Sequence, residues 1–183
     1  MHEDIYATGK LFELVHVTQP DGRVFEVARR APGVRVIIVD RDARKVLLTK
    51  EFRQELNAHD YRLPGGKVFD SLADYETFRG SGQDIMQPAT EKAKGEAAEE
   101  AGIIIEDVKF YKKSTLGATV EWDLYVFEAA NWSEHADGQA LEDGEQVEDV
   151  SWYDFATVEH MILNGDMQEG RIALILLQWL KEQ

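Results

Sequence analysis

The stretch that decides the fold reads Gly95-Glu96-Ala97-Ala98-Glu99-Glu100-Ala101-Gly102-Ile103. In a helix that runs to Gly102, the three glutamates Glu96, Glu99 and Glu100 share one face. Three carboxylates on adjacent turns repel one another, so the pattern indicates a divalent cation between them, because Mg²⁺ prefers carboxylate oxygen. Gly102 is typical of the residue that ends a helix. For this stretch taken alone, a solvated acidic face is the alternative.

Composition and charge limit the classes of protein to consider. The chain has 183 residues, of which 44% are hydrophobic, and this is enough apolar material for the core of one domain. Its net charge of −15 argues against nucleic acid and anionic membranes as partners, because both would repel it. The absence of cysteine excludes disulfides and thiolate metal sites. The sequence shows neither a secretion signal nor a membrane-spanning run, so we expect a cytoplasmic protein.

Short β-prone runs and turn residues predict a small N-terminal lobe before the main domain. Pro20-Asp21-Gly22 is a typical turn, so the runs on either side of it are predicted to form an antiparallel β-hairpin. We place this lobe at residues 1–30 and the main domain at residues 31–183. In the main domain the pattern predicts a buried helix at 172–180 and strands at 34–39, 45–49, 109–111, 122–127 and 147–152.

Leu63-Pro64-Gly65-Gly66 lies upstream of the glutamate stretch, and together the two segments resemble the motif of the Nudix hydrolases. That motif is written G-x5-E-x7-R-E-U-x-E-E-x-G-U, where U is a bulky aliphatic residue. Gly66 matches its first glycine, and the three glutamates with Gly102 and Ile103 match its second half. The order of elements is similar over nearly the whole chain, most of all to the branch that cleaves ADP-ribose and other nucleoside diphosphate sugars. The resemblance implies an α/β fold, an α/β/α sandwich with a mixed sheet, to which the N-terminal lobe is added.

The chain departs from the motif in its first half. Gly66 and Glu96 are 30 positions apart, where the motif has fifteen, so residues 68–86 contain an insertion that we expect to form a loop or lid. The motif's arginine falls on Gly95 and its upstream glutamate on Gln87, so the ion pair between them is absent. A glycine inside a helix costs roughly 0.5–1 kcal/mol relative to alanine. We therefore expect the insertion to pack against the bare backbone of Gly95, and a glycine that is tolerated passively is the alternative.

The resemblance implies a set of metal ligands in this chain. Glu96 and Glu100 would be the main ligands, joined by the backbone carbonyl of Gly65, and Glu99 would act in catalysis as a further ligand or by orienting water. The metal ion is expected to be Mg²⁺, with Mn²⁺ as a substitute. Such ions neutralise the oxygens of a pyrophosphate and lower the pKa of bound water.

Two further residues complete the site that the resemblance implies. In this branch an acidic residue from the loop before the last strand completes the site or acts as base, and Glu145 fits best, with Glu142 and Asp143 as alternatives. Arg53 follows a predicted strand, so it is expected to bind a substrate phosphate, or else to form a surface salt bridge. The five histidines lack ligand spacing and are expected to be structural or exposed. The tryptophans are expected in the core: Trp122, Trp152 and Trp179.

The resemblance predicts that the chain hydrolyses a nucleoside diphosphate sugar to a nucleoside monophosphate and a sugar phosphate. ADP-ribose is the leading substrate and GDP-mannose the second. The alternatives are a pyrophosphohydrolase of nucleoside triphosphates or capped ends, and a non-catalytic module that senses a nucleotide. The glutamate cluster argues against such a module, because a pure binder has little use for that many repelling carboxylates.

The N-terminal hairpin predicts a homodimer. A lone hairpin is marginal in water and needs a surface to cover its apolar side. In a dimer of this branch, the aromatic residues Tyr6 and Phe12 would be placed to stack on a nucleobase. We expect no nucleic acid and no membrane as partner.

Overall fold

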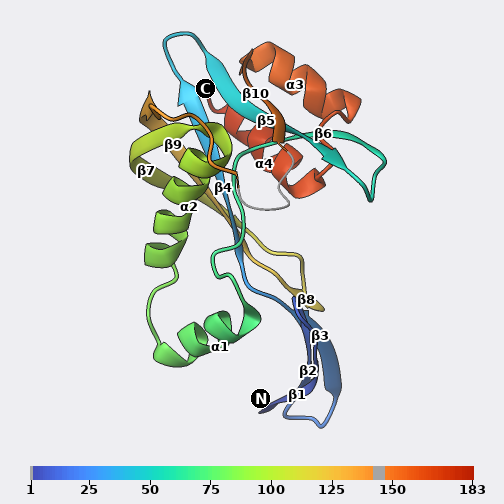
Figure 1. Ribbon diagram of the computed structural model, residues 1–183. Coiled ribbons are helices and arrows are strands. Elements are labelled where there is room, and N and C mark those ends of the chain that lie inside the picture. Colours follow the sequence, from blue (N-terminus) through green and yellow to red (C-terminus); the bar gives the residue numbers. More distant parts are fainter. Residues whose placement is uncertain (1, 142–146) are drawn as a thin grey trace.

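The computed structural model describes residues 2–141 and 147–183, which form two sheets and four helices (Figure 1). The strands are β1 (His2–Thr8), β2 (Glu13–Thr18), β3 (Val24–Arg29), β4 (Gly33–Asp40), β5 (Lys45–Arg53), β6 (Ala58–Arg62), β7 (Ile103–Ser114), β8 (Val120–Glu121), β9 (Leu124–Glu134) and β10 (Val147–Asp154). The helices are α1 (Leu72–Ser81), α2 (Met86–Ala101), α3 (Phe155–Asn164) and α4 (Gly170–Lys181). In the larger sheet the order is β10-β5-β4-β9-β7, with β6 paired to β5, and in the smaller it is β1-β2-β3-β8.

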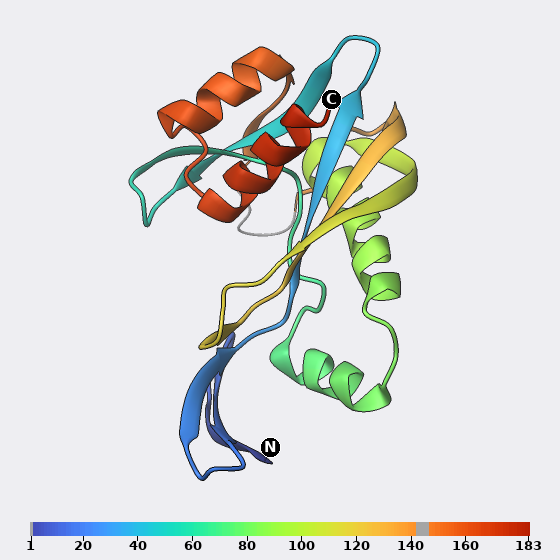
Figure 2. The same cartoon turned by 180° about the vertical axis from the view of Figure 1, so that it is seen from behind.

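The larger sheet is covered by helices on both faces, as the sequence predicts. Along β4, Val34, Val36 and Ile38 point to the cluster that α2 covers, and Ile37 and Val39 point to the cluster under α3 and α4. This alternation is the period of a strand whose two faces are both buried. Figures 1 and 2 show α2 on one side of the sheet and the α3–α4 pair on the other. The predicted α/β/α sandwich with a mixed sheet is confirmed, since β4 runs parallel to β9 and antiparallel to β5.

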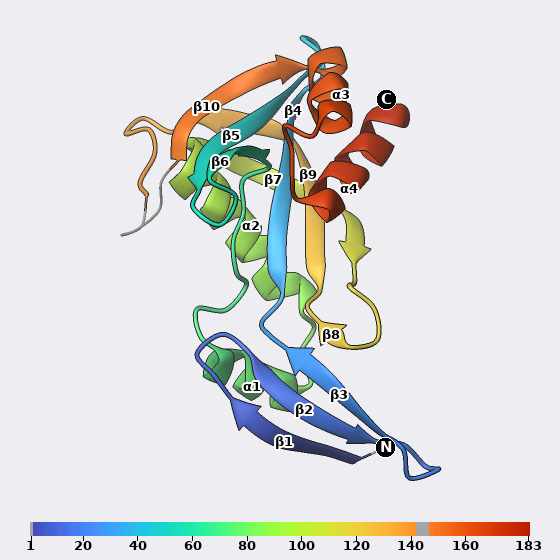
Figure 3. The same ribbon diagram turned by 90° about the vertical axis from the view of Figure 1, so that its right-hand side faces the viewer.

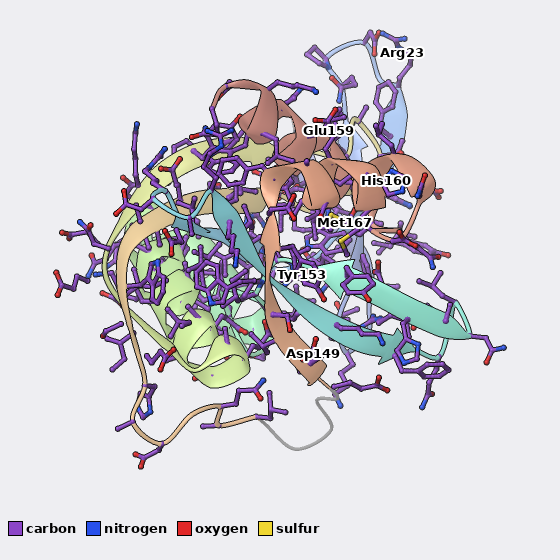
Figure 4. All side chains as sticks on the ribbon, turned by 90° about the horizontal axis from the view of Figure 1, so that it is seen from above. Arg23, Asp149, Tyr153, Glu159, His160 and Met167 are labelled. Atoms are coloured by element: carbon purple, nitrogen blue, oxygen red, sulfur yellow. The ribbon has the colours of Figure 1, made fainter. Side chains whose placement is uncertain are left out.

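Helix α4 contains residues 172–180, which the sequence predicts to form a buried helix. Trp179 on α4 is fully buried, and its indole Nε1 donates to Glu128 Oε2 at 2.7 Å, so this tryptophan is a core residue as predicted. Figure 4, seen from above, labels Glu159 and His160 on α3 and Tyr153 on β10, the strand that α3 follows and contacts. His160 is exposed, as expected for a histidine without a ligand role. No helix in the described part of the chain is long and apolar enough to cross a membrane.

The N-terminal lobe contains the predicted hairpin, which is β2 and β3, together with two strands that the sequence analysis does not predict. Strand β1 pairs with β2, and the short β8 pairs with β3 (Figure 3). The Arg29 side chain is buried and holds these strands together through carboxylates on three of them. It contacts Glu3 at 2.8 Å, Glu13 at 3.1 Å and Glu121 at 2.9 Å. Because Glu121 lies on β8, this ion cluster ties the lobe to the segment that leads into β9.

The inserted segment contains a helix, so the prediction of a loop is wrong there, while a role as a lid stays a prediction. Helix α1 begins with the Ser71 hydroxyl, which accepts from the Asp74 backbone N–H at 3.1 Å, and it ends at Gly82. Phe69 packs on Tyr75 and Phe78 of the helix, with ring centroids 5.5 and 5.0 Å apart. These ring contacts stabilise a short helix that would be marginal alone.

The expectation that the insertion packs on Gly95 is also wrong. A methyl group at Gly95 would meet only Glu99 Oε1, at 3.8 Å, among the described residues. Gln87 lies exposed in the first turn of α2, where its side chain donates to Glu91 at 3.2 Å. The insertion leads directly into α2, which starts at Met86, and does not cross over the helix at Gly95.

Gly95→Ala is therefore expected to stabilise the protein. The methyl group has room, and alanine gains roughly 0.5–1 kcal/mol over glycine inside a helix. For a domain of this size the melting temperature should rise by about 2–4 °C, with activity unchanged. Thermal unfolding followed by circular dichroism measures the change. A lower melting temperature would show that a neighbour does occupy this space.

Two tryptophans, one on β9 and one on β10, stack on each other. Trp132 on β9 and Trp152 on β10 have ring centroids 4.7 Å apart and planes at 28°. The Trp132 indole also donates to the Val39 carbonyl at 3.1 Å. Both rings are partly buried against the α2-side cluster, so Trp152 contributes to the core as predicted.

Candidate active site

The glycine turn that follows β6 lies alongside β4. The Val36 N–H donates to the Pro64 carbonyl and the Val34 N–H donates to the Gly66 carbonyl, both at 2.9 Å. Between these two bonds, the Gly65 carbonyl has no backbone donor among the described residues. This carbonyl is the one that the sequence analysis expects to bind a metal ion, so its lone pairs are available for that role.

Only glycine fits at Gly65, and the next residue, Gly66, is closely approached by a glutamate side chain. Gly65 has φ of 147°, and a methyl group there would lie 2.2 Å from the Val34 carbonyl oxygen. At Gly66 a methyl group would lie 2.1 Å from Glu96 Oε1. The first contact is with backbone, which cannot give way as a flexible side chain does. The turn thus brings the backbone and the glutamate helix closer together than any side chain would allow.

Two of the predicted glutamates are buried against this turn. Glu96 is 4% and Glu100 is 7% exposed, and the Gly65 N–H donates to Glu100 Oε2 at 2.7 Å. Burial raises the pKa of Glu100 to about 8, although Arg35 and the Gly65 N–H lower it. Burial also raises the pKa of Glu96, against the lowering effect of Lys92. Carboxylates that lose this much hydration are stabilised when a cation binds them.

A lysine ammonium lies at the third glutamate. Lys92 Nζ is 3.0 Å from Glu96 Oε1 and 3.7 Å from Glu99 Oε2, and the Glu99 side chain is 37% exposed. The three glutamates therefore differ in burial: Glu96 and Glu100 are buried at the glycine turn, whereas Glu99 lies toward solvent. In the described part of the chain, no three acidic or histidine side chains are grouped closely enough to hold a metal ion.

The donor chemistry nevertheless fits a divalent cation. Glu96, Glu100 and the Gly65 carbonyl offer oxygen donors alone, which is the set that Mg²⁺ and Mn²⁺ prefer. The space that a side chain would take at Gly66 is occupied by the Glu96 carboxylate, so the turn is shaped around this group. A further acidic residue, which completes the site or acts as base, is expected from the acidic loop.

The described end of that loop lies against the last turn of α2. The Ala140 N–H donates to the Glu99 carbonyl at 2.9 Å, and the Gln139 side chain donates to the Glu100 carbonyl at 2.5 Å. On the far side of the loop, Val147 lines the same cavity as Glu100. The candidates for the base lie outside the described residues: Glu142, Asp143 and Glu145.

Two cavities open beside the buried glutamates and share Arg35, Arg53, Arg62 and Gly66 as a common wall. The first cavity has a volume of about 440 Å³ and contains Glu100 in its lining. The second has a volume of about 280 Å³ and contains Glu96. The predicted residue Arg53 lies where the two cavities meet, and it also pairs with Glu51 at 3.3 Å and Glu55 at 2.8 Å.

Two arginines in the common wall were missed by the sequence analysis. Arg35 has a buried Nε atom without a hydrogen-bond partner among the described residues. Arg62 pairs with the buried Asp60 at 2.7 Å. Arg35 carries a sequence signal, because it interrupts the apolar run of β4 at a position where the alternation calls for a buried side chain. Arg62 has a weaker signal, since it directly precedes Leu63 and the glycine turn.

Trp122 is not the core residue that the sequence analysis expects. It belongs to neither core cluster and lines the second cavity. Its ring contacts two guanidinium groups, those of Arg30 at 4.2 Å and Arg171 at 4.3 Å from the ring centroid. Cation–π contacts of this kind hold an aromatic ring in place at a partly exposed wall.

Comparisons with known proteins add two likenesses. No family model matches the sequence. A curated relative, the GDP-mannose pyrophosphatase of Enterobacter sp. (strain 638), is 29% identical over 175 residues, which cover 90% of this chain and 83% of the relative. The crystal structure of an ADP compounds hydrolase matches with a TM-score of 0.65 at 18% identity, over 100% of this chain and 94% of that one. At this identity the structural likeness bears on the fold, and it confirms the predicted fold class.

Proposed function

We propose that this chain, which has the fold of the Nudix hydrolases and the glutamate helix of their motif, hydrolyses the pyrophosphate bond of a nucleoside diphosphate sugar. The names of the curated relative and of the structural neighbour support this proposal, because both describe enzymes acting on nucleoside diphosphate compounds. ADP-ribose and GDP-mannose remain the two leading substrates.

The observation that carries the proposal is the pair of buried carboxylates in a cleft that is also lined by three arginines. Glu96 and Glu100 lie next to Arg35, Arg53 and Arg62, although the chain as a whole is strongly acidic. Guanidinium groups bind phosphate oxygens through paired N–H donors. A cleft that offers these donors beside buried carboxylates fits a substrate with phosphate groups and a cation between the two sets of negative charges.

We propose distinct roles for the residues around the bond that is cleaved. Glu96, Glu100 and the Gly65 carbonyl would hold Mg²⁺ or Mn²⁺, which neutralises charge on the pyrophosphate when bound. Arg53 would orient a phosphate, and Glu99 would hold or orient the attacking water. Glu145 would take the proton of that water, a role supported by the loop's described flanks, which both lie near Glu100.

Hydrolysis should depend on a divalent cation and give two phosphorylated products. The test is a panel of ADP-ribose, GDP-mannose, a nucleoside triphosphate and a capped dinucleotide, assayed with Mg²⁺, with Mn²⁺ and with excess chelator. We expect a nucleoside monophosphate and a sugar phosphate from the nucleotide sugars, identified by mass spectrometry, and no turnover in chelator. Full activity in chelator would rule out this mechanism, and turnover of the triphosphate or the cap alone would favour one of the alternatives.

We propose further that the chain forms a homodimer through its N-terminal lobe. Large apolar side chains are exposed there: Ile5, Tyr6, Leu11, Phe12, Val24 and Phe25. Light scattering at micromolar concentration should give twice the monomer mass of 20.8 kDa. The paired substitution Ile5→Glu and Val24→Glu should shift the mass to that of the monomer, whereas Leu163→Glu on the exposed side of α3 should not. A monomeric wild type would contradict the proposal.

A cytoplasmic location also remains a prediction.

A further inference from the structure

Charge is divided unevenly between the two cavities. Of the described residues, three cationic side chains and three carboxylates line the first cavity, so its charges balance. The described lining of the second cavity has two carboxylates, Asp70 and Glu96, against six cationic side chains: Arg30, Arg35, Arg53, Arg62, Lys67 and Lys92. Of these six, Arg53 pairs with Glu51 and Glu55, Arg62 pairs with Asp60, and Lys92 pairs with Glu96 and Glu99. Arg35 also lines the first cavity, so the cations that the second cavity adds without an ion pair among the described residues are Arg30 and Lys67.

Three of these cations have no carboxylate partner within ion-pair distance among the described residues: Arg35, which also lines the first cavity, and Arg30 and Lys67, which do not. The Arg30 guanidinium stacks on Trp122 and on Phe12, at 4.2 and 5.2 Å from the ring centroids. Lys67 is exposed, and within the described ranges its ammonium donates a hydrogen bond to the Asp70 carbonyl alone, at 3.4 Å. Burial and the nearby Arg171 lower the pKa of Arg30, so its positive charge is held at an electrostatic cost. A bound anion would remove this cost.

Trp122 adds an unused hydrogen-bond donor to the same wall. Its Nε1 atom is buried and has no acceptor among the described residues, and an indole N–H can only donate. The ring is fixed by its two guanidinium contacts, and Arg171 Nη1 donates to the Trp122 carbonyl at 3.0 Å. A buried donor without an acceptor is costly, and an oxygen atom of a ligand would satisfy it.

We propose that the second cavity binds an anionic group that the substrate carries in addition to its pyrophosphate. This inference rests on the proposed function. A pyrophosphate diester has one negative charge on each phosphate, and cations at Glu96 and Glu100 would add positive charge to the cleft. Arg53 and such cations would match the charge of the pyrophosphate, so Arg30 and Lys67 are left for a further anionic group. The substrate class is a nucleoside diphosphate sugar with a further phosphate or carboxylate, recognised by Arg30, Lys67 and the Trp122 N–H.

Matched substrate pairs test the proposal and separate the two anionic groups. ADP-ribose is compared with its 2′-phosphorylated form, and UDP-glucose is compared with UDP-glucuronate, as kcat/KM in the presence of Mg²⁺. At least one charged member should be preferred about tenfold, which corresponds to one hydrogen bond to a charged group. Preference in the first pair indicates a phosphate subsite, and preference in the second indicates a carboxylate subsite. A ratio of one or less in both pairs would overturn the proposal.

Substitutions then locate the preference in the second cavity. Lys67→Gln and Arg30→Gln should each bring the ratio toward one, and Arg30→Lys should keep more of it because the charge remains. The matched control is Lys109→Gln, which removes one charge from an exposed position on β7. Since the Lys67 side chain is exposed, its replacement tests the proposal without unfolding the protein. An unchanged ratio in Lys67→Gln and Arg30→Gln would contradict the assignment.

Binding of products separates this inference from the proposed function. Calorimetry compares adenosine 5′-monophosphate with adenosine 2′,5′-bisphosphate, and glucose 1-phosphate with glucuronic acid 1-phosphate. The charged member of at least one pair should bind about tenfold more tightly to the wild type, and less so to Lys67→Gln. This result would support the subsite even if no nucleotide sugar were hydrolysed, in which case only the proposed function would fail. Equal affinities within both pairs would overturn the subsite.

Discussion

Glu100→Gln is expected to lower kcat by about 100-fold or more, with a smaller change in KM. The substitution keeps the shape of the side chain and its bond from the Gly65 N–H, since the amide oxygen can still accept. It removes a negative charge that would hold the cation on which the transition state depends. Steady-state kinetics with the best substrate of the panel measure the two constants separately. Glu106→Gln, on the exposed edge of β7, is the matched control and should leave both constants unchanged.

The same substitution should stabilise the metal-free protein at high pH. The pKa of Glu100 is about 8 in the folded chain and near its ordinary value of 4.5 when unfolded. Between these values the folded chain holds a proton that the unfolded chain has released, so the free energy of unfolding falls as pH rises. In chelator, Glu100→Gln should lose this dependence and melt a few degrees above the wild type at pH 8. A wild type equally stable at pH 5 and pH 8 would contradict the raised pKa.

The other acidic candidates are ranked by the same assay. Glu96→Gln should also lower kcat by about 100-fold or more, because Glu96 is buried in the same way. Glu145→Gln should be severe if this residue is the base, and Glu142→Gln should be milder. Equal activity of Glu145→Gln and the wild type would move the role to Asp143 or Glu142.

Gly65→Ala is expected to cause the largest loss of stability of any single methyl group added to this site. The new Cβ would lie 2.2 Å from the Val34 carbonyl oxygen and 2.9 Å from the Arg35 Cα, and φ of 147° is strained for alanine. Overpacking and backbone strain each cost about 1–3 kcal/mol, so unfolding should become easier by roughly 2–5 kcal/mol. The melting temperature should fall by about 5–15 °C.

A glycine in open space provides the control for this experiment. Gly80 in α1 has no atom within 4 Å of an added Cβ among the described residues, and its φ is ordinary. Gly80→Ala should therefore keep or slightly raise the melting temperature. If both variants melt like the wild type, the turn must be able to move away from β4.

Local sequence signals predicted those parts of the site that depend on near neighbours in the chain. Gly102 ends α2 in the left-handed conformation, with φ of 63°, as its place after the glutamates predicts. Glu96 and Glu100 are one turn apart, so the helix alone places them on one face. Helix α1 had a local signal too, because Ser71 followed by Asp74 is a capping pattern. Its aromatic contacts with Phe69 were needed to make the helix stable.

Contacts between distant segments could not be predicted in this way. Trp122 lies in the cavity wall because Arg30 and Arg171, both far from it in sequence, stack on its ring. A tryptophan in an isolated sequence is more often a core residue, so composition favours the wrong answer here. Lys92 has the spacing to reach Glu96 on one helix, but the interaction matters only because burial makes the carboxylate a strong partner.

The stacked Trp132 and Trp152 give the protein an optical reporter. Two indoles with centroids 4.7 Å apart couple electronically, so the pair should produce its own band in the near-ultraviolet circular dichroism spectrum. Trp152 lies on β10, whose first residue, Val147, lines the cavity beside Glu100. A shift of β10 on nucleotide binding would change the distance or angle between the rings. The near-ultraviolet circular dichroism of the unlabelled protein would then report the motion of this strand.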